Sequence, residues 1–457
     1  MTRDFDIGRR RWLLGAAALA TTAPVAAFAK AAPAKPTPLL LASDFGLVPG
    51  TDIDQSAILQ KAIDAAAERG VPLFIAGGNY RVGNIQLGFR TTVIGQDGAT
   101  TFFAIGAEPI FSATEVTDVT VRSIGFDGVG SGASDRHGGL LAFKKCSNLM
   151  LAAVSVSGSP GNGIYLDGCS GALAGCRIDK AGAAGIFAIN SHELTIGQSQ
   201  VTNCGNGGIL VWQDQSGPDG TIVTGNHIAR IAAEDGGTGE NGNGINIFRA
   251  DNVIVSDNVI SDCAFSAVRA NSTRDVAIRG NTCRNLHEVA IYSEFAFSGS
   301  VIANNVVDGA AAGISITNLD QGGKLAVCSG NVVRNIVLDS ASSPGSQRYG
   351  IYAEAQTAIT GNSVDGVAGV GIAAGYGEFL DNVLIADNVI SASDTGIGVS
   401  VAKGAGKVRI AGNMISGAKV RGIVGMRWDE VASSDLVADA AQFPNVSIDG
   451  NIVGLTG

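Results

Sequence analysis

The sequence predicts an all-β protein that folds as one long solenoid of stacked, similar coils. Two short phrases recur along the chain, one built around asparagine and one in which glycine or alanine precedes isoleucine or valine. Successive copies of the second phrase mostly start about 21 to 26 residues apart, a period typical of repeat architectures. Hydrophobic residues make up 46% of the 457 residues, aromatic residues make up 6%, and 64 residues are glycine. This composition excludes collagen, which needs a strict glycine triplet, and argues against disorder.

The first 29 residues have the pattern of an export signal. Arg9–Arg11 precede Trp12–Leu14, a short apolar stretch and an Ala-x-Ala site at Ala27–Ala29. The apolar stretch is too short to span a bilayer as a helix, so no stable membrane span is expected. Paired arginines followed by bulky apolar residues resemble the twin-arginine signal, whose translocase exports folded proteins. An ordinary secretory signal with a chance arginine run is the alternative. We therefore expect a periplasmic or secreted protein with a signal peptide at 1–29 and a Pro/Ala linker at 30–42.

A single helix is expected from about Asp54 to Arg69. Gly70 and Pro72 follow it as stop signals, and its apolar residues fall on one face at positions 58, 62, 63 and 66. A strand is expected directly after the helix, at Leu73–Ile75.

This N-terminal region carries a family resemblance. The Asp44-Phe45-Gly46 segment, the Gln60-Lys61-Ala62-Ile63-Asp64 helix and the Gly78-Asn79-Tyr80 strand resemble the start of pectate-lyase-like right-handed parallel β-helices. In that superfamily the helix caps the solenoid, whose first coil would otherwise expose its core and strand edges. The resemblance implies a right-handed single-stranded parallel β-helix of roughly twelve or thirteen coils. The cap and first coils would occupy residues 43–118, and the β-helix repeats residues 119–457.

The chain as a whole resembles a second family, the twin-arginine-exported repeat proteins. That resemblance covers the signal, the cap and the coils, but the family has no assigned activity to carry over to individual residues.

The asparagine phrase predicts a structural ladder rather than chemistry. An asparagine at the same corner of each coil can bond its amide to the asparagines above and below and satisfy turn backbone groups. The series consists of Asn226, Asn258, Asn281, Asn305, Asn331, Asn362, Asn388, Asn413 and Asn451. The seven cysteines are odd in number and lie mostly within repeat phrases, so buried thiols are expected rather than disulfides.

The period breaks twice at the same corner of the coil. Two long insertions, Ala229–Asn243 and Arg334–Tyr349, separate a ladder asparagine from the next glycine phrase. Insertions in a solenoid project from one face, often the binding face. In pectate-lyase-like proteins this corner leads into the strand whose outward side carries the substrate groove, so the insertions would enclose such a groove.

The outward residues of that strand have the composition of a sugar-binding surface. Aromatic rings stack on sugar rings, and the guanidinium group of arginine binds a carboxylate through two hydrogen bonds. This composition favours an oligosaccharide ligand, and an anionic one. Polar outward positions on a solvated sheet are the structural alternative. The predicted substrate-binding residues are Tyr292, Tyr352, Arg249, Phe248, Asn246, Asn271, Trp212 and Thr317.

Glu294, Glu354 and Arg269 are the candidate catalytic residues. The two glutamates fall in one column two coils apart, so at about 4.8 Å per coil their backbones would lie about 9.6 Å apart, near the upper limit for inverting hydrolysis. Arg269 could neutralise a uronate and ease proton removal in β-elimination or C5 epimerisation. Arginine is a poor general base, although the pectate-lyase resemblance allows one. His137 and His287 are alternative bases, although a lone histidine in a turn is usually only solvated.

Other function classes are weaker. The formal net charge of −10 argues against a nucleic-acid footprint, which needs a basic face. The polygalacturonase motifs are missing, and Asp135-Arg136-His137 matches the Asp-Pro-His-Asp phrase of the mannuronan epimerases poorly. The acidic stretch Glu234–Glu240 is a candidate Ca²⁺ site, although such loops are usually only solvated, and no other cofactor or metal is implied. The sequence therefore favours a carbohydrate-active lyase or hydrolase, with a non-catalytic polysaccharide-binding, envelope-structural or adhesin-like solenoid as the alternative.

Overall fold

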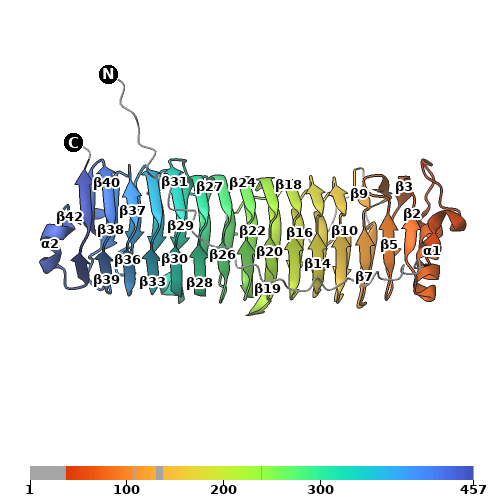
Figure 1. The fold of residues 1–457 in the computed structure, drawn as a ribbon, viewed down its shortest axis with the longest axis horizontal. Helices are drawn as coiled ribbons and strands as arrows, with labels where there is room; N and C mark the ends of the chain where they lie inside the picture. Colours follow the sequence, from red (N-terminus) through yellow and green to blue (C-terminus); the bar gives the residue numbers. More distant parts are fainter. Residues whose placement is uncertain (1–37, 107–108, 130–136, 238, 456–457) are drawn as a thin grey trace, which may run out of the picture. The chain divides into compact units, whose positions relative to one another are not determined.

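The chain forms a parallel β-helix, as the sequence predicts. The computed structural model describes residues 38–106, 109–129, 137–237 and 239–455. The predicted signal peptide and most of the predicted linker lie outside the described residues. Corresponding strands of successive coils pair side by side and in parallel, and they form three ladders that run through the unit Leu39–Gly457 (Figure 1).

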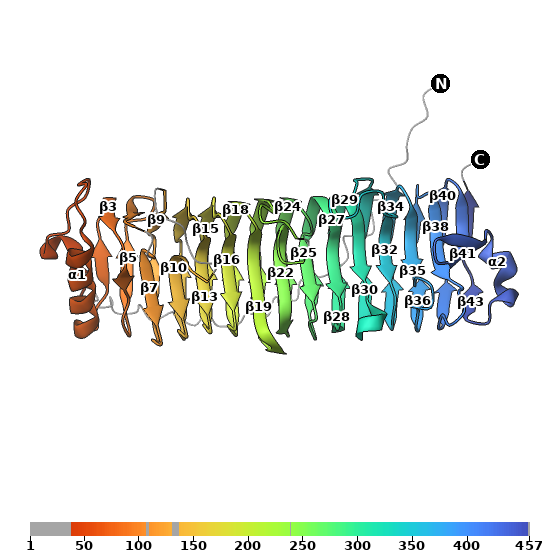
Figure 2. The same ribbon diagram turned by 180° about the vertical axis from the view of Figure 1, so that it is seen from behind.

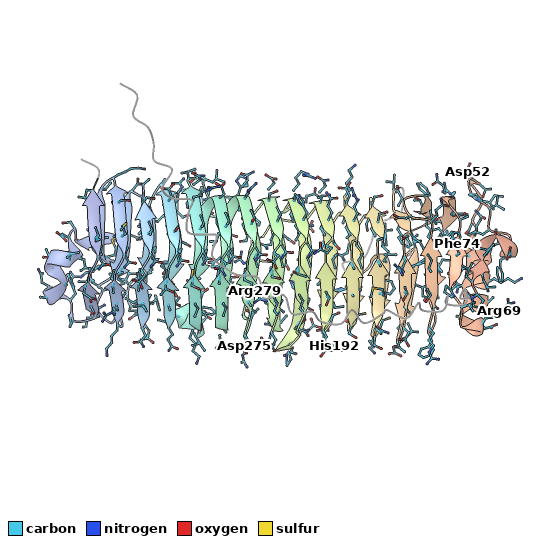
Figure 3. All side chains as sticks on the ribbon, in the orientation of Figure 1. Asp52, Arg69, Phe74, His192, Asp275 and Arg279 are labelled. Carbon is cyan, nitrogen blue, oxygen red and sulfur yellow. The ribbon has the colours of Figure 1, made fainter. Side chains whose placement is uncertain are left out.

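The first ladder is a separate sheet of 16 strands. Its strands are β1 Leu40–Leu41, β2 Leu73–Ile75, β5 Thr92–Gly95, β8 Thr120–Arg122, β11 Leu149–Ala152, β14 Gly171–Ala174, β17 Leu194–Gly197, β20 Ile222–Thr224, β23 Ile254–Ser256, β26 Ala277–Arg279, β28 Ser298–Ala303, β30 Lys324–Ser329, β33 Thr357–Thr360, β36 Val383–Ala386, β39 Val408–Ala411 and β43 Val446–Asp449. In Figure 3 the labelled side chains of His192 and Asp275 lie along one edge of this ladder, at the turns before β17 and β26.

The second ladder follows the asparagine corner. Its strands are β3 Gly78–Val82, β6 Thr100–Ala104, β9 Gly125–Asp127, β12 Ser155–Ser157, β15 Arg177–Asp179, β18 Gln200–Cys204, β21 His227–Ile231, β24 Val259–Cys263, β27 Thr282–Glu294, β29 Val306–Ile316, β31 Val332–Ile336, β34 Ser363–Val367, β37 Val389–Ser391, β40 Met414–Ala418 and β44 Ile452–Leu455.

The third ladder carries the glycine phrase and the predicted groove. Its strands are β4 Ile85–Gln86, β7 Phe111–Thr114, β10 Gly139–Lys144, β13 Asn162–Asp167, β16 Ala184–Ile189, β19 Gly207–Pro218, β22 Asn243–Asp251, β25 Val268–Asn271, β32 Tyr349–Ala353, β35 Val370–Ala374, β38 Thr395–Ser400 and β41 Arg421–Arg427. The long strands β27 and β29 run through both the second and the third ladder and join them into one 28-stranded sheet. Figure 2 shows β10, β13, β16, β19, β22 and β25 following one another along the third ladder.

Helix α1, Ser56–Arg69, covers the first coil as predicted (Figure 1). It buries Leu59, Ala62, Ile63 and Ala66, and it ends at Gly70, whose φ of 64° is left-handed. It starts two residues later than expected because the Asp54 carboxylate accepts the Ser56 main-chain N–H at 2.8 Å, which holds Asp54 outside the helix.

The last coils carry a short helix, α2 Leu436–Asp439, and an antiparallel strand, β42 Glu430–Ser433, which sequence reasoning did not anticipate. Short 3₁₀ turns lie at Ala42–Phe45, Leu319–Gln321 and Ala440–Gln442. None of the helices in the described residues has the length and hydropathy that crossing a membrane requires.

The core is a column of inward-facing Val, Ile, Leu and Cys side chains enclosed by the three ladders. All seven cysteines are buried and unbridged, which confirms the expectation of buried thiols. In the first coils the column is aromatic, with the rings of Phe102, Phe111 and Phe126 within 5.1–5.7 Å of one another.

The predicted asparagine ladder is present. Each side-chain oxygen accepts both the main-chain N–H and the side-chain N–H of the asparagine one coil below; Asn305 Nδ2, for example, donates to Asn331 Oδ1 at 3.0 Å. The same Nδ2 also donates to the carbonyl oxygen of Ile278 at 2.9 Å. Below Asn226 the same corner position is held by Ser199 and then by Cys176, whose main-chain N–H binds the Ser199 hydroxyl.

Replacing Asn305 by alanine is expected to lower the free energy of unfolding by about 2–4 kcal/mol, because two buried backbone groups, the Asn281 N–H and the Ile278 carbonyl, lose their partners. The matched control is Gln215→Ala on an exposed part of β19, for which a change below about 0.5 kcal/mol is expected. The midpoint of urea unfolding measures both, and equal midpoints for the two variants would contradict a structural role for the ladder.

Candidate functional site

The register of the third ladder arranges the predicted site residues in two outward columns. One column contains, coil after coil, Asn246, Arg269, Tyr292, Ser315 and Tyr352. The other contains Trp212, Phe248, Asn271 and Glu294, and main-chain hydrogen bonds continue it to Thr317 and Glu354. The two glutamates are therefore two coils apart, as the repeat spacing predicts.

Arg269 and Glu294 form a buried, two-pronged ion pair. Arg269 Nε lies 2.7 Å from Glu294 Oε1, and one of its terminal nitrogens lies 2.9 Å from Glu294 Oε2. The side chains are 7% and 2% exposed. Asn271 also donates to Glu294 Oε1 at 2.9 Å. Burial alone would lower the pKa of Arg269, but the hydrogen bonds and charges of Glu294 and Glu288 raise it, so the guanidinium stays charged.

Glu288 is a third carboxylate that sequence reasoning missed. Its Oε2 lies 3.1 Å from the remaining terminal nitrogen of Arg269, and its Oε1 accepts the Ser342 hydroxyl at 2.9 Å. Burial raises the pKa of Glu288 more than the nearby Arg269 lowers it. Glu288 lies where the pairing of β27 with β29 shifts by one residue, between Leu286 and Val289. Such a bulge re-aims a side chain, and a reading by regular alternation does not detect it.

Glu354 is held by three donors. Its Oε1 accepts the hydroxyls of Thr317 at 2.7 Å and Tyr352 at 2.9 Å, and its Oε2 accepts the main-chain N–H of Leu319 at 2.7 Å. These three bonds fix the position of both carboxylate oxygens of Glu354.

Three half-buried tyrosines lie among these carboxylates. The rings of Tyr349 and Tyr352 are 5.1 Å apart, and the Tyr292 ring lies 4.9 Å from the guanidinium carbon of Arg269. Burial raises the pKa of all three phenols. The charges of Glu288 and Glu354 both add to the rise for Tyr349, which places this ring within electrostatic reach of both carboxylates. Tyr349 was expected only as the last residue of an insertion.

Both predicted insertions fold back onto the outward face of the third ladder. They are shorter than expected, residues 232–242 and 337–348, because strand pairing continues through Ile231 and Ile336. Asn246 Nδ2 ties the first insertion down at the carbonyl of Gly239, at 2.8 Å. The second reaches down to β27, where the Ala341 N–H donates to the His287 carbonyl at 2.7 Å. At the opposite corner, β19 extends to Pro218 and the 3₁₀ turn Leu319–Gln321 lies beside Glu354. The spacing of the phrases did not reveal these two features.

The predicted aromatic residues below this cluster form a row. Trp212 meets Phe248 edge-on at 5.8 Å and Phe187 at 5.1 Å. The exposed Arg249 covers Phe248, with its guanidinium carbon 4.7 Å from the ring. Trp212 and Phe248 are half-buried, whereas Phe187 is buried.

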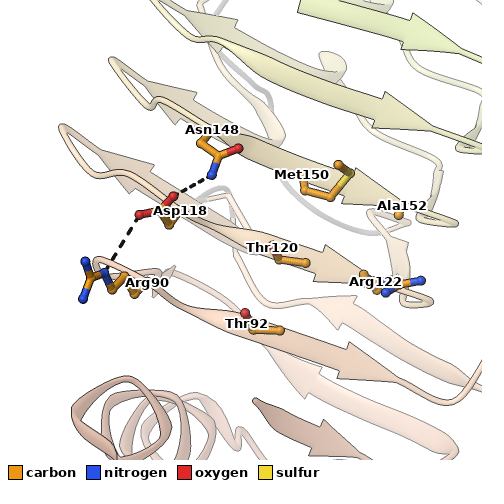
Figure 4. Close-up of a pocket in the computed structure, with 8 residues that line it drawn as sticks. All are labelled: Arg90, Thr92, Asp118, Thr120, Arg122, Asn148, Met150 and Ala152. Carbon is orange, nitrogen blue, oxygen red and sulfur yellow. Dashed lines mark hydrogen bonds and ion pairs between the residues drawn. The ribbon is translucent and has the colours of Figure 1, made fainter. Parts of the chain in front are cut away.

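The alternative sites bring together fewer side chains that could act as acids, bases or ligands. His137 lies against Tyr165 and Phe187, several coils from Glu294. A hollow of about 560 Å³ lies on the first ladder. At its edge Asp118 contacts both Arg90 and Asn148 (Figure 4). Within the described residues, no group of three or more His, Cys, Asp or Glu side chains is placed to hold a metal ion. In the predicted Ca²⁺ loop the Asp235 carboxylate accepts a hydrogen bond from Asn206.

The sequence matches the family described as the right handed beta helix region over residues 89–228 and 162–322. Together these matches span 89–322, more than half of the 457 residues. The chain belongs to this family. A comparison with curated proteins finds no match for this right-handed β-helix.

The fold of this right-handed β-helix is similar to several solved structures. The surface adhesin PfbA of Streptococcus pneumoniae is 16% identical with a TM-score of 0.51, covering 87% of this chain and 94% of that one. The catalytic unit of a GH87 alpha-1,3-glucanase from Streptomyces thermodiastaticus is 13% identical with a TM-score of 0.50, covering 93% and 71%. At such identities the likeness shows the fold alone, and this fold is shared by carbohydrate-active enzymes and adhesins.

Breaking the Arg269–Glu294 pair on one side is expected to cost about 3–5 kcal/mol of unfolding free energy, because the remaining charge stays buried. In a double-mutant cycle, Arg269→Met combined with Glu294→Gln should cost clearly less than the sum of the two single changes. The exposed pair Arg334–Asp308 is the control, for which we expect little or no coupling because solvent screens it. Additive effects at Arg269 and Glu294 would show that the two side chains do not stabilise each other.

The raised pKa of Glu288 predicts a pH dependence of stability. The folded protein holds this proton more tightly than the unfolded chain, whose carboxyl titrates near the ordinary value of 4.5. The contribution of Glu288 to stability is therefore full below about pH 4.5 and is lost as the pH rises through the folded-state pKa. Over this interval the melting temperature of Glu288→Gln should rise relative to that of the wild type, by on the order of 1–2 °C. A difference in melting temperature between the two proteins that stays constant from pH 4 to about 8 would contradict the assignment.

Proposed function

We propose that this right-handed β-helix is an exported carbohydrate-active protein that binds a polysaccharide across the third ladder, from β19 to β32, and hydrolyses it. The observation that carries the proposal is the gathering of Tyr292, Tyr349 and Tyr352 with Glu288, Glu294 and Glu354 on one outward face, beside two insertions that fold onto it. Half-buried tyrosines offer ring faces for sugars, and carboxylates supply acid and base groups.

Hydrolysis is favoured over the lyase and epimerase alternatives by the state of Arg269. Three of its nitrogens already contact Glu294 and Glu288. Neutralising a uronate would require Arg269 to leave two buried carboxylates unpaired, which is strongly unfavourable. The carboxylates also outnumber the single arginine, so the cluster disfavours an anionic sugar, contrary to the preference inferred from the sequence.

Glu288 and Glu354 have different surroundings, and two carboxyl groups in different surroundings suit acid and base roles. Burial raises the pKa of Glu288, which is the direction that a general acid requires. Glu354 accepts three hydrogen bonds, which hold both of its carboxylate oxygens in the fixed position that a base or nucleophile requires. Glu294 and Arg269 act as positioning residues in this scheme, because their charges are directed at each other and at Glu288.

The targeting signal belongs to the same proposal. Residues 1–29 act as a twin-arginine signal peptide, residues 30–42 as a linker, and the mature protein is periplasmic or secreted. The proposal includes membership in the family of twin-arginine-exported repeat proteins, a resemblance that covers the signal, the cap and the coils.

The second candidate is a non-catalytic polysaccharide-binding or envelope-structural protein. It is favoured by the internal saturation of the cluster, since all four carboxylate oxygens of Glu294 and Glu354 already accept hydrogen bonds. The likeness of the fold to a surface adhesin is compatible with it.

The test is to incubate the mature protein with a panel of neutral, amino-sugar and uronate glycans and to follow reducing ends together with the ultraviolet absorbance of unsaturated ends. We expect new saturated ends, reduced at least about 100-fold in Glu354→Gln and in Glu288→Gln. The control is Glu430→Gln on the exposed strand β42, which should keep full activity. Unsaturated ends would identify a lyase and overturn the hydrolase assignment, and binding without new ends would favour the second candidate.

A further inference from the structure

Three aromatic side chains gather at one corner of the last coils, outside the groups that the proposed function uses. Trp428 lies in the turn of the hairpin that β41 forms with β42, near the C-terminal end of the solenoid (Figure 1). Its ring meets that of Tyr376 edge-on at 4.9 Å and that of Phe379 at 6.4 Å. Trp428 is 47% exposed and Tyr376 is 42% exposed. Two large rings are therefore exposed side by side, although burying each of them would be favourable.

The local structure holds the indole of Trp428 in this place. Trp428 has a φ of 56°, in the left-handed region that bulky residues rarely adopt. Gly377 lies against the indole, and a Cβ atom at this glycine would come within 2.2–2.4 Å of three ring carbons. The Asp429 carboxylate, in the same turn, accepts the Tyr376 hydroxyl at 3.0 Å. Backbone strain that the surroundings enforce in this way is found at ligand sites.

The two exposed rings lie close to the end of the predicted groove. The segment 375–380, which carries Tyr376, belongs to the coil next to Glu354, and the Asp381 main-chain N–H donates to the Glu354 carbonyl at 2.8 Å. The hairpin turn with Trp428 comes from two coils further along, and it folds back over this segment. Since adjacent coils are about 4.8 Å apart, the rings extend the outward face beyond Glu354.

A hollow of about 640 Å³ lies beside the indole, within the range of small-ligand sites, about 300–1,000 Å³. Four polar side chains line it together with Trp428: Lys403, Arg427, Gln442 and Asn445. The side-chain nitrogens of Gln442 and Asn445 are held by the Asp439 carboxylate and by two main-chain carbonyls. Their amide oxygens, like the side chains of Lys403 and Arg427, form no hydrogen bond with any other described residue. The hollow therefore offers both donors and acceptors to a ligand.

These groups fit an uncharged sugar. Sugar hydroxyl groups both donate and accept hydrogen bonds, as do the side chains of the hollow taken together. A pyranose ring with equatorial hydroxyl groups presents C–H bonds on its faces, and these fit an aromatic ring. Two carboxylates lie near the two cations and balance their charge: Asp429 follows Trp428, and Glu378 lies against Gly404. An anionic sugar therefore has no electrostatic advantage here.

We propose that Trp428 and Tyr376 form a binding subsite for an uncharged pyranose unit with equatorial substituents, such as glucose or N-acetylglucosamine. The sugar ring lies on the indole, and its hydroxyl groups reach the polar side chains of the hollow. The inference deepens the proposed function, on which it rests for the polymeric nature of the ligand. It names the class of sugar and extends the groove beyond Glu354 toward the C-terminal end.

The first test places the ligand by tryptophan fluorescence. From residue 30 onward the chain contains two tryptophans, Trp212 and Trp428, so the Trp212→Phe variant leaves Trp428 as the single reporter. It is titrated with three β-1,4-linked or α-1,4-linked hexamers: one of glucose, one of N-acetylglucosamine and one of a uronic acid. We expect the two uncharged hexamers to shift the emission of Trp428. The uronate hexamer should bind at least about 10-fold more weakly, because the net charge of −10 repels it.

The second test measures the affinity of variants for the uncharged hexamers by calorimetry. Trp428→Ala should weaken binding at least about 10-fold, and Tyr376→Ala about 3-fold. Gly377→Ala removes no group that touches the sugar, but it displaces the indole and should weaken binding as well. The matched control is Phe89→Ala in the first coils, where a ring that is 52% exposed is removed and the affinity should not change.

Several results would overturn the proposal. They are wild-type affinity in Trp428→Ala and Gly377→Ala proteins whose melting curves are unchanged, tighter binding of the uronate hexamer, and no binding of either uncharged hexamer. A constant emission of Trp428 while a hexamer binds would also overturn it. Self-association that Trp428→Ala abolishes would assign the exposed rings to a second copy of the chain instead.

The outcome separates from that of the proposed function, because Glu354→Gln should abolish hydrolysis and leave binding at Trp428 intact. Hydrolysis whose rate and KM do not change in Trp428→Ala would remove the subsite and leave the hydrolase. Binding of the uncharged hexamers at Trp428 without hydrolysis of any glycan would do the reverse.

Discussion

Every part of this protein depends on parallel coils that stack in register. Each backbone N–H in a strand bonds to the coil beside it, so a residue is forced into a column with its counterparts one period away. The asparagine corner shows how strict this constraint is, because each buried amide is satisfied only when the next coil places an asparagine directly above it. A coil that slipped by one residue would break the ladder and turn its core side chains outward.

Stacking also explains how chemistry gathers on one face without any local motif. Arg269 and Glu294 are 25 residues apart in sequence, yet they lie on adjacent coils and pair at 2.7 Å. Ser342 reaches Glu288 across 54 residues because an insertion lies over the coils below. The charges are buried by this arrangement, and a buried carboxylate is tolerated only with partners. The partners that stabilise Glu294 and Glu354 also hold their carboxylate groups in fixed positions on the outward face.

The fold was predictable from the sequence because the same sequence phrases recur once in most coils. The ladder asparagines, the helix that ends at Gly70 and the alternation of the outward columns follow from spacing and chemistry that recur in every coil. The site was predictable only in part. Regular alternation located Glu294, Glu354 and Arg269, but the bulge that turns Glu288 toward Arg269 is a departure from that alternation. Spacing places Arg269 in its column but does not reveal that Glu294 and Glu288 already surround it. The position of Tyr349 depends on how the second insertion folds, which the repeat does not encode.

The most direct test of the groove is a crystal structure of the Glu354→Gln protein soaked with the oligosaccharide that binds it best. A chain of sugar rings is expected across β19 to β32, with rings on Trp212 and on the tyrosines, and with a glycosidic oxygen within hydrogen-bond distance of Glu288. Sugar bound only at the first ladder, or across the third ladder with no glycosidic linkage near Glu288, would contradict the account. The cluster of Glu288, Glu294 and Glu354 with the three tyrosines would then have no hydrolytic role.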